Sequence, residues 1–388
     1  MSIVCDYNEI KNKIIEIRRK IHMHPELSFE EYETAKEICA FLDEHNISYT
    51  SEIAKTGICA LVGNPRADKC ILIRADMDAL PYEEHTGLDF ASVNKGVMHA
   101  CGHDLHIASA LAACYILKKH ESEFDGCVKI VFQPGEETTG GAKPMIDEGV
   151  LLNPEPQICI GAHVTPEYPT GELYFRSGAL MASPDDFRIV FTGKSAHGAE
   201  PQNGINPIDA AAEFSVGIKQ KLCEKIDFTH NVFTICSFNS GTANNIIPDT
   251  AVIEGTFRSF STNDRKTAEE IMKDYAKSVC KKYGAESELT YNYLYPPLIN
   301  DAEVCGDVKQ FAISEFGKEK IKEFEKPLMT GEDFSYFALS KPSVFVWAGC
   351  APQGKKGALH SAEFVADEDV IEICARLFAG YTLKYFNN

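Results

Sequence analysis

Thiol, imidazole and carboxylate side chains that can bind metal ions occur at a few separate places in the chain. These are the usual ligand types of catalytic zinc and of related divalent ions. One carboxylate beyond such a ligand set would be available to move protons. The combination predicts a metal-dependent hydrolytic site. The candidate metal ligands are Cys101, His103, Glu137, His163 and His360.

Glu136 and Glu137 are adjacent and follow an apolar segment that ends at Pro134-Gly135. Neighbouring residues on a regular strand point to opposite faces, so the break is needed if both carboxylates are to serve one site. We expect Glu137 to bind metal, and Glu136 to remain uncoordinated and accept a proton from the attacking water. A solvated acidic turn is the simpler alternative for a lone pair of glutamates.

Cys101 and His103 lie within His99–His106, a segment with three histidines just before an apolar helix. In an extended segment, residues two apart face the same way, so both side chains can reach one ion. A cation and a helix N-terminus both favour the thiolate. Taken alone, the pair is more simply explained as a buried thiol beside a helix cap. His163 and His360, each taken alone, have an ordinary explanation as histidines with satisfied partners.

Acid and imidazole groups are expected at one edge of the predicted sheet. Asp76 and Asp78 follow one predicted strand, Glu136 follows a second and His163 a third. In open α/β sheets, ligands bind outside the carboxyl ends of the strands. We interpret Asp78 as a carboxylate that orients a ligand imidazole. A turn-forming aspartate before a proline is the alternative.

Short apolar segments bounded by turn residues predict strands that are buried on both faces, as in a mainly parallel sheet. These segments are 57–63, 70–75, 128–132, 157–162 and 343–348. Helical patterns cover residues 8–22, 30–45 and 106–118, and Asp104 is the expected N-cap of the last helix. The alternation of strands and helices predicts an α/β fold.

The middle of the chain has a different pattern. Strands are expected at 186–193, 231–238, 251–260 and 287–295, and helices at 206–226 and 262–283. This β-α-β-β-α-β order is typical of a ferredoxin-like unit. Prolines at 184, 296 and 297 are plausible hinges. We therefore predict an α+β domain of residues 184–295, inserted into an α/β domain of residues 1–183 and 296–388.

Composition excludes several classes of function. A formal charge of −19 repels phosphate backbones, which argues against nucleic-acid binding. No apolar run approaches the roughly 20 residues needed to span a bilayer. The charged N-terminal segment does not fit a secretory signal. Fourteen cysteines are dispersed along the chain, several within apolar segments, which indicates free thiols in a reducing compartment. We therefore expect a cytoplasmic enzyme that binds neither membranes nor nucleic acids.

Five segments together resemble one known family in order and spacing. They are RADMDALP at 74–81, HACGHDLH at 99–106, QPGEE at 133–137, GAH at 161–163 and LHSAE at 359–363. Over nearly its whole length the chain resembles the metallo-amidohydrolase and carboxypeptidase family. Within that family it resembles the branch of aminoacylases, hippurate hydrolases and indoleacetyl-amino-acid hydrolases.

The resemblance implies a catalytic domain that binds two divalent metal ions per subunit, with zinc, manganese, nickel and cobalt all compatible with the ligands. It implies that Cys101 is shared between the ions and that Glu136 is the general base. The full ligand set implied by the resemblance is Cys101, His103, Glu137, His163 and His360.

The resemblance also implies that the inserted domain is a lid through which two chains form a homodimer. In such enzymes the lid histidine, here His197, can reach the site of the partner subunit and stabilise the oxyanion. Asn245 and Arg258 match lid segments that contact substrate, and would hold the free carboxylate of an N-acyl amino acid. A surface salt bridge on a lid strand is the alternative explanation for Arg258.

The chain departs from the peptidase branches of this family at two positions. Those branches have a His-x-Asp pair where this chain has Asp76 and Asp78, and an aspartate where it has Cys101. His103 is the obvious replacement for the missing histidine ligand. The departure places the chain among the amidohydrolases that act on small molecules.

The expected reaction is hydrolysis of N-acyl amino acids, with acetyl or aromatic, hippurate-like acyl groups, to a carboxylic acid and a free amino acid. A metallo-dipeptidase or carboxypeptidase acting on short peptides is the alternative within the same chemistry. A different class would use Cys101 with His103 or His99 as a thiol–imidazole nucleophile. A third class is a non-catalytic metal-binding protein that keeps the site for assembly.

Overall fold

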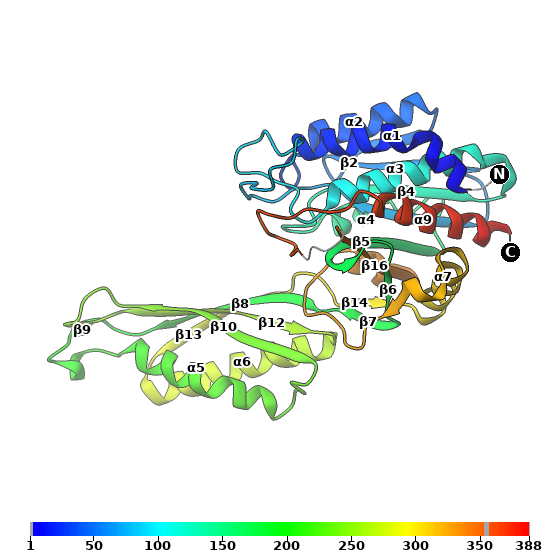
Figure 1. Ribbon diagram of the computed structural model, residues 1–388. Coiled ribbons are helices and arrows are strands. Elements are labelled where there is room, and N and C mark those ends of the chain that lie inside the picture. Colours follow the sequence, from blue (N-terminus) through cyan, green and yellow to red (C-terminus); the bar gives the residue numbers. More distant parts are fainter. Residues whose placement is uncertain (1–2, 353–356, 388) are drawn as a thin grey trace. The chain divides into compact units, whose positions relative to one another are not determined.

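The protein is described here from a computed structural model that covers residues 3–352 and 357–387 (Figure 1). The chain folds into two units. The first unit comprises the described residues up to Leu180, together with Ile299–Lys326 and the residues from Asp333 onward. The second unit comprises Met181–Leu298 and Pro327–Glu332.

The first unit is built on an eight-stranded sheet with the order β1-β2-β4-β3-β5-β16-β6-β15 (Figure 1). The pairs β4–β3, β3–β5, β5–β16 and β6–β15 are parallel, and the other three pairs are antiparallel. The prediction of a mainly parallel sheet is therefore confirmed. The strands are β1 (Ser48–Ile53), β2 (Gly57–Gly63), β3 (Cys70–Asp76), β4 (Cys127–Gln133), β5 (Ile158–Pro169), β6 (Leu173–Phe175), β15 (Ile321–Glu323) and β16 (Ser343–Ala351).

Helices cover this sheet, and α3 is the most deeply buried of them. It packs on β3 and is itself covered by α1 and α9 (Figure 1). Its sequence is apolar nearly all round, as expected for a helix enclosed on every side. The helices are α1 (Ile3–Met23), α2 (Tyr32–Glu44), α3 (His103–Lys119), α4 (Ala142–Asp147), α7 (Ala302–Phe316), α8 (Ser335–Ser340) and α9 (Val370–Asn387), with short 3₁₀ turns η1 (Glu121–Glu123) and η3 (Lys318–Lys320).

The predicted N-cap of this buried helix was wrong. The N-cap is Gly102, in the left-handed region with φ of 84°, and Asp104 lies inside the first turn. The Asp104 carboxylate is fully buried and is 2.7 Å from Nε of Arg18 and 2.8 Å from Nδ1 of His22. The Asp104 carboxylate is therefore paired with the buried Arg18 of α1 and does not cap α3.

The second unit has the predicted β-α-β-β-α-β order (Figure 1). Its antiparallel sheet has the order β10-β12-β8-β13, which is the ferredoxin-like arrangement. Helices α5 and α6 pack together and share one apolar core with the sheet. The elements are β8 (Ser183–Thr192), β9 (Ala196–His197), η2 (Pro201–Asn203), α5 (Pro207–Cys223), β10 (Asn231–Ser240), β11 (Ile246–Ile247), β12 (Thr250–Ser259), α6 (Thr262–Tyr283) and β13 (Glu286–Asn292).

Two small sheets complete the described structure. Strands β9 and β11 pair with each other within the second unit. Strands β7 (Gly178–Met181) and β14 (Leu298–Asn300) also pair, at the positions in the chain where one unit passes into the other.

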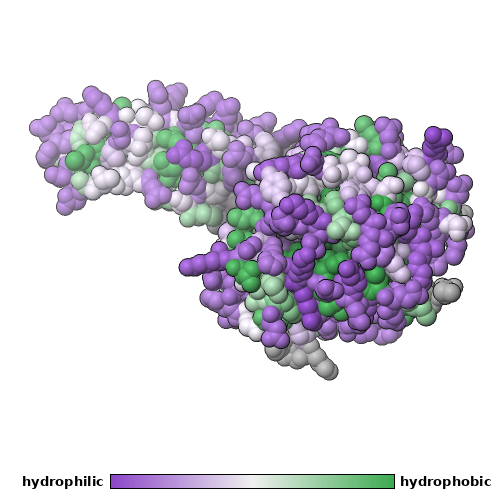
Figure 2. Space-filling model, turned by 90° about the horizontal axis from the view of Figure 1, so that it is seen from above, coloured by the Kyte–Doolittle hydropathy of each residue, from purple (hydrophilic) through white to green (hydrophobic). Residues whose placement is uncertain are grey.

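The surface agrees with the charged composition. Hydrophilic residues dominate the face seen in Figure 2, with hydrophobic side chains interspersed among them. Among the described residues, no helix combines the length and the apolar character that crossing a bilayer requires.

Candidate metal centre

The candidate ligands of the first unit lie where several elements end or begin. Cys101 and His103 stand at the start of α3, and Glu137 lies in the turn that follows β4. His163 lies within β5, and His360 belongs to a loop before α9. These positions come from four separate parts of the chain. The fold of the sheet therefore brings them together.

The ligand atoms form two groups of three that share Cys101. One group is Cys101, His103 and His163, and the other is Cys101, Glu137 and His360. Within each group the sulfur, nitrogen and carboxylate atoms all lie within 4.8 Å of one another. Two ions held side by side, with the thiolate between them, would use such a pair of groups.

His103 presents Nε2 to the cluster because Nδ1 is already used. Nδ1 donates to the backbone carbonyl of Asp78 at 2.8 Å, and Nε2 has no hydrogen-bond partner among the described residues. Nε2 lies 3.6 Å from Asp76 and 3.8 Å from Glu137. Burial alone would lower the pKa of His103, but the surrounding carboxylates raise it to about 10. The site therefore favours a positive charge at this nitrogen, whether a proton or a metal ion.

His163 is fixed in a similar way but stays neutral. Its Nδ1 donates to the Val164 carbonyl at 2.6 Å, and its Nε2 lies 3.3 Å from the sulfur of Cys101. The indole of Trp347 stacks on the ring, with centroids 4.8 Å apart. Burial and the neighbouring His106 hold the pKa of His163 well below its usual range. A neutral imidazole that carries its proton on Nδ1 can bind a metal ion through Nε2.

The surroundings of Cys101 favour a metal-bound thiolate over a free nucleophile. Burial, together with Glu137 and Glu136, raises the pKa of this thiol well above its usual value. A catalytic cysteine needs a lowered pKa. The other proposed partner, His99, is buried, and burial lowers its pKa to about 4. In the absence of a cation the thiol keeps its proton, so the geometry does not favour the thiol–imidazole alternative.

Glu137 and His360 complete the second group. Nε2 of His360 lies 3.3 Å from Oε1 of Glu137, and that oxygen is buried without a hydrogen-bond partner in the described part of the chain. The backbone of His360 is left-handed, with φ of 55°, and its N–H donates to the Ala100 carbonyl at 2.9 Å. Left-handed backbone at a residue other than glycine is strained and persists where the structure enforces it. The bond to Ala100 holds the imidazole beside Cys101.

Asp78 organises the turn that carries the two glutamates. Its carboxylate accepts the N–H of Glu136 at 3.1 Å and the N–H of Glu137 at 3.0 Å. It also accepts the hydroxyl of Ser28 at 2.6 Å and lies 3.3 Å from Nδ1 of His103. Asp78 thus touches one ligand imidazole and the backbone of two candidate catalytic residues.

Glu136 is buried beside the cluster. Only 8% of the residue is exposed, and its carboxylate lies within 4.8 Å of the ligand atoms of His103 and Glu137. This places a second carboxylate next to the two groups that share Cys101. The arrangement leaves it able to exchange a proton with a molecule bound at the ligands.

Two expectations about these segments were wrong. The Cys101–His103 segment is not extended, because Gly102 adopts φ of 84°. A Cβ at Gly102 would lie 2.5 Å from Cγ2 of Val164, so glycine permits close packing against β5. His163 does not follow its strand but lies inside it, because β5 continues to Pro169 while paired with β16.

A further group of possible ligands is not free to bind metal. Asp76, His103 and His106 also lie close together. However, Nδ1 of His106 bonds to Asp76 at 2.5 Å, and its Nε2 accepts the N–H of Val164 at 2.9 Å. Asp76 is also paired with Arg74 at 2.6 Å. His106 and Asp76 therefore support the backbone next to His163.

Sequence reasoning assigned no role to Trp347 or His106. Trp347 is the only tryptophan, but its contact with His163 depends on the pairing of β16 with β5. His106 belongs to the segment with three histidines, which was a usable signal. Its partner on β5 was not visible in the sequence.

The candidate substrate residues lie in the second unit. His197 and Asn245 are exposed and adjacent, since His197 pairs with Ile246 and Gly198 donates to the Asn245 carbonyl at 2.8 Å. Arg258 lies near the opposite end of β12, eight residues or roughly 27 Å of strand from Thr250. Within one unit, the structure therefore does not bring Arg258 to the other two residues.

Arg258 does not form the surface salt bridge that was considered as its alternative role, among the residues that the structure describes. The side chain is half-buried, and no ion pair to it is found among the described residues. Burial lowers the pKa of its guanidinium, while Asp185 opposes that shift.

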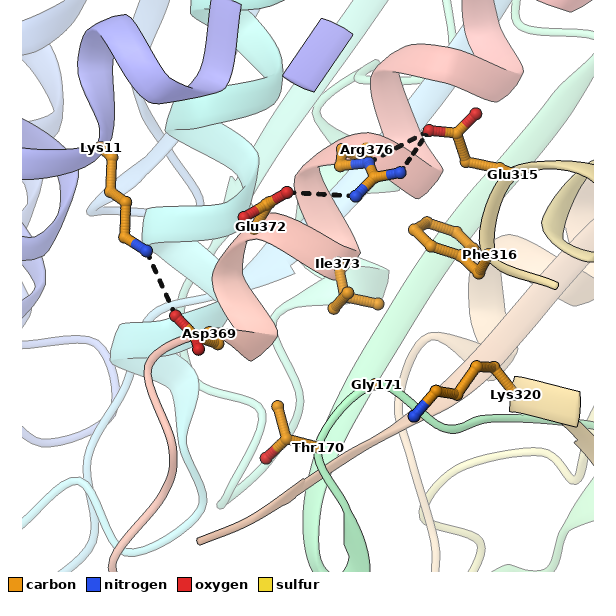
Figure 3. Close-up of a pocket in the computed structure, with 10 residues that line it drawn as sticks. All are labelled: Lys11, Thr170, Gly171, Glu315, Phe316, Lys320, Asp369, Glu372, Ile373 and Arg376. Carbon is orange, nitrogen blue, oxygen red and sulfur yellow. Dashed lines mark hydrogen bonds and ion pairs between the residues drawn. The ribbon is translucent and has the colours of Figure 1, made fainter. Parts of the chain in front are cut away.

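Figure 3 shows a separate pocket in the first unit, with a volume of about 460 Å³. Its charged groups largely satisfy one another. Lys11 lies 3.2 Å from Asp369, and Arg376 pairs with Glu315 at 2.7 Å and with Glu372 at 3.1 Å. It shares no residue with the Cys101 groups. The pocket is therefore not the candidate catalytic site.

Comparisons with known proteins show what the chain is similar to. Residues 72–384 match the family described as peptidase family M20/M25/M40. The chain is 37% identical to thermostable carboxypeptidase 1 of Saccharolobus solfataricus, over 98% of both chains. It is 37% identical to N-acetylcysteine deacetylase of Bacillus subtilis, over 95% of both chains. A crystal structure described as a dinuclear metal binding peptidase from the M20 family, also from Bacillus subtilis, matches with a TM-score of 0.84 at 33% identity, covering 98% of this chain and 99% of that one.

Proposed function

This chain belongs to peptidase family M20/M25/M40, and from that membership we propose that it hydrolyses the amide bond of N-acyl amino acids. It is a metal-dependent hydrolase that acts on amide bonds. The proposed products are a carboxylic acid and a free amino acid. The deacetylase relative supports an acyl amino acid as the substrate class.

The sharing of Cys101 between two groups of ligands is the observation that carries this proposal. One soft thiolate, three imidazoles and one carboxylate suit zinc, manganese, nickel or cobalt. The unpartnered buried atoms Nε2 of His103 and Oε1 of Glu137 face this cluster, as expected of ligands that await a cation. We propose that a pair of divalent ions binds here.

The ions would polarise the scissile carbonyl and lower the pKa of the attacking water. Glu136 is proposed to accept the proton from that water and to deliver it to the departing amine nitrogen. The hydrogen bonds from Nδ1 of His103 and of His163 keep each Nε2 turned toward the cluster. Asp78 holds the backbone of Glu136 and Glu137, which fixes the base relative to the ligands.

We further propose that residues 184–295 act as a lid through which two chains form a homodimer. His197 would donate a hydrogen bond to the oxyanion in the site of the partner subunit. His197 lies far from Arg258 on the same unit. This separation supports a substrate site to which two chains contribute residues. Arg258, half-buried with no ion pair in the described structure, would hold the free carboxylate of the substrate together with Asn245, which lies beside His197 and would come with it from the partner subunit.

A carboxypeptidase that acts on short peptides is the second candidate. The relative from Saccharolobus solfataricus supports it, because its identity to this chain, 37%, equals that of the deacetylase relative. Both activities would use the same ligands and the same base. They differ only in the group on the acyl side of the scissile bond.

A substrate panel with defined metal loading tests the proposal. Protein dialysed against chelator, and then reloaded with manganese or zinc, is assayed on acetyl, benzoyl and aminoacyl amides of one amino acid. We expect activity on the acetyl or benzoyl amides that disappears with the metal and returns on reloading. Preference for the aminoacyl amide would favour the peptidase, and activity that survives metal removal would contradict both.

A further inference from the structure

The turn after β4 is held by two buried carboxylates that bind three successive backbone N–H groups. Asp78 accepts the N–H groups of Glu136 and Glu137, as described above. Glu31, the residue before α2, accepts the N–H of Gly135 at 3.0 Å. Both acids come from earlier in the chain, Glu31 from the segment before α2 and Asp78 from the segment after β3. Together they leave the turn little freedom to shift.

Glu31 is fully buried and its oxygens are satisfied. Oε1 accepts the N–H of Phe29 at 2.8 Å as well as that of Gly135, and Oε2 accepts the hydroxyl of Thr56 at 2.5 Å. A buried carboxylate is stable only when such donors surround it. Thr56 lies between β1 and β2, so Glu31 links that connection to the turn after β4.

The segment around Glu31 also packs directly on the turn. Gly135 has φ of 67°, and a Cβ there would lie 2.4 Å from Cε2 of Phe29. Phe29 itself has a left-handed backbone, with φ of 62°. Ser28, one residue earlier, donates to Asp78 at 2.6 Å. Residues 28–31 therefore wrap the turn, with Glu31 as the acid that binds its first N–H.

We propose that Glu31 is a positioning residue for the proposed base Glu136 and the proposed ligand Glu137. The inference rests on the proposed function, since it concerns the same two glutamates. Glu31 accepts the backbone N–H of Gly135, the residue before Glu136, so it would act on both glutamates through the backbone of the turn. Displacement of a catalytic group by about 1 Å can cost two orders of magnitude in rate, so the link has a measurable consequence.

Three substitutions separate positioning from general stability. Glu31→Ala removes the acceptor of the Gly135 N–H. Glu31→Gln keeps an oxygen for that N–H and can donate its amide to the hydroxyl oxygen of Thr56. Glu31→Asp keeps the carboxyl group but withdraws its oxygens by one methylene. Asp6→Ala is the matched control, because Asp6 is equally buried and bonds to Lys119 and His120, away from the site.

Each variant is assayed well below its unfolding temperature, as purified and after saturation with manganese. We expect Glu31→Ala to lower kcat by about 10- to 100-fold, with KM little changed. Glu31→Asp should show an intermediate loss, and Glu31→Gln should retain the wild-type kcat. Asp6→Ala should lose thermal stability and keep its kcat.

Two readouts do not depend on activity. Hydrogen exchange of residues 133–141 in metal-free protein should accelerate in Glu31→Ala and Glu31→Asp, and remain slow in Glu31→Gln and Asp6→Ala. Metal affinity, followed through the emission of Trp347 on His163, should fall in the first pair only. If Glu31→Ala does not fold, Glu31→Asp decides the question.

Wild-type kcat, exchange and metal affinity in Glu31→Asp or Glu31→Ala would overturn the positioning role. If the proposed function itself is wrong, the experiments give a different result. In that case the wild type hydrolyses no N-acyl amino acid, while exchange and metal affinity still report whether Glu31 holds the turn.

Discussion

Cys101, His103 and His163 differ in the charge that their surroundings favour. Burial raises the pKa of the Cys101 thiol, whereas nearby carboxylates raise that of His103 to about 10 despite its burial. Burial lowers the pKa of His163. The cluster thus contains a neutral imidazole, an imidazole whose surroundings favour positive charge, and a thiol that ionises only beside a cation. A divalent ion satisfies all three at once.

Substitutions of the two adjacent glutamates are expected to impair different steps, proton transfer in one case and metal binding in the other. Glu136→Gln should keep its metal and lose about two to four decades in kcat, because only the proton transfer is removed. Glu137→Gln, the matched substitution, should bind metal weakly, because a proposed ligand is lost. Metal content and kcat are measured on the same preparations.

Near-normal turnover in Glu136→Gln would remove it from the role of base. Equal loss of metal in the two variants would mean that the division of roles between them is wrong.

The residues of the candidate site were predictable from the sequence, but the residues that contact and orient them were not. Cys101 and His103 were found because they lie in a segment with three histidines just before a predicted helix, and the glutamates because they follow a predicted strand. Glu31 and Trp347 gave no such signal, since their contacts depend on which distant segments lie side by side. The left-handed Gly102 was likewise hidden, because only the packing of Val164 explains it.

At the scale of elements, α1 and α3 are joined by a buried ion pair. Arg18 of α1 lies 2.7 Å from Asp104 of α3, and both side chains are almost fully buried. His22 adds a contact of 2.8 Å to the same carboxylate. Because Asp104 follows His103 directly, this link also fixes the start of the helix that carries a proposed ligand.

Asp104→Ala should lower the free energy of unfolding by about 3–5 kcal/mol, because the buried Arg18 would lose its nearest carboxylate and keep only Glu368, at 3.2 Å, as an ion-pair partner. Lys11→Ala breaks an exposed pair with Asp369 and should cost less than about 1 kcal/mol. Urea unfolding of the metal-free variants measures both values. Equal effects of the two substitutions would show that the buried pair does not anchor α1 to α3.

The other end of α3 carries a pH-dependent contact with α1. Nε2 of His120 lies 2.9 Å from Asp6, and Nδ1 lies 2.9 Å from Glu123. Burial alone would lower the pKa of His120, but these two carboxylates raise it above 6.5. The stabilisation is therefore complete below the unfolded value of 6.5 and is lost as the pH rises through the folded value.

His120→Gln tests this dependence. The difference in unfolding free energy between wild type and variant should be larger near pH 6 than near pH 8.5, at about constant ionic strength. Lys119, which also contacts Asp6, stays charged over this range and serves both proteins equally. A difference that grows with pH would contradict the assignment.

The hydrophobic pattern of the sequence predicted the order of helices and strands correctly, but it predicted the residues at which they begin and end less accurately. The helix from Thr262 to Tyr283 was predicted to the residue, because Ser261 caps it and Gly284 ends it. The end of β5 was missed because pairing with β16 extends the strand beyond its apolar segment. The cap at Asp104 was missed because a buried arginine from α1 competes for the carboxylate.

At the scale of the whole molecule, a formal charge of −19 surrounds a site proposed to bind anionic substrates. Bound cations and Arg258 would make that site locally attractive to a carboxylate. The proposed dimer adds His197 from a second chain. Function would then depend on residues from both units and both subunits.

Mixing two inactive variants tests whether His197 acts in the partner's site. Glu136→Gln and His197→Ala are refolded together. A heterodimer would contain one site with both wild-type residues, so random pairing should restore about a quarter of the wild-type activity. Each variant refolded alone is the control. No gain on mixing would mean that His197 acts within its own chain or not at all.

Anomalous scattering from crystals grown with manganese or zinc would test the central claim most directly. The account predicts a pair of peaks on either side of the sulfur of Cys101, bounded by the side chains of His103, Glu137, His163 and His360. Glu136 should lie next to them without coordinating either ion. Peaks elsewhere in the molecule, or none at full metal loading, would contradict it.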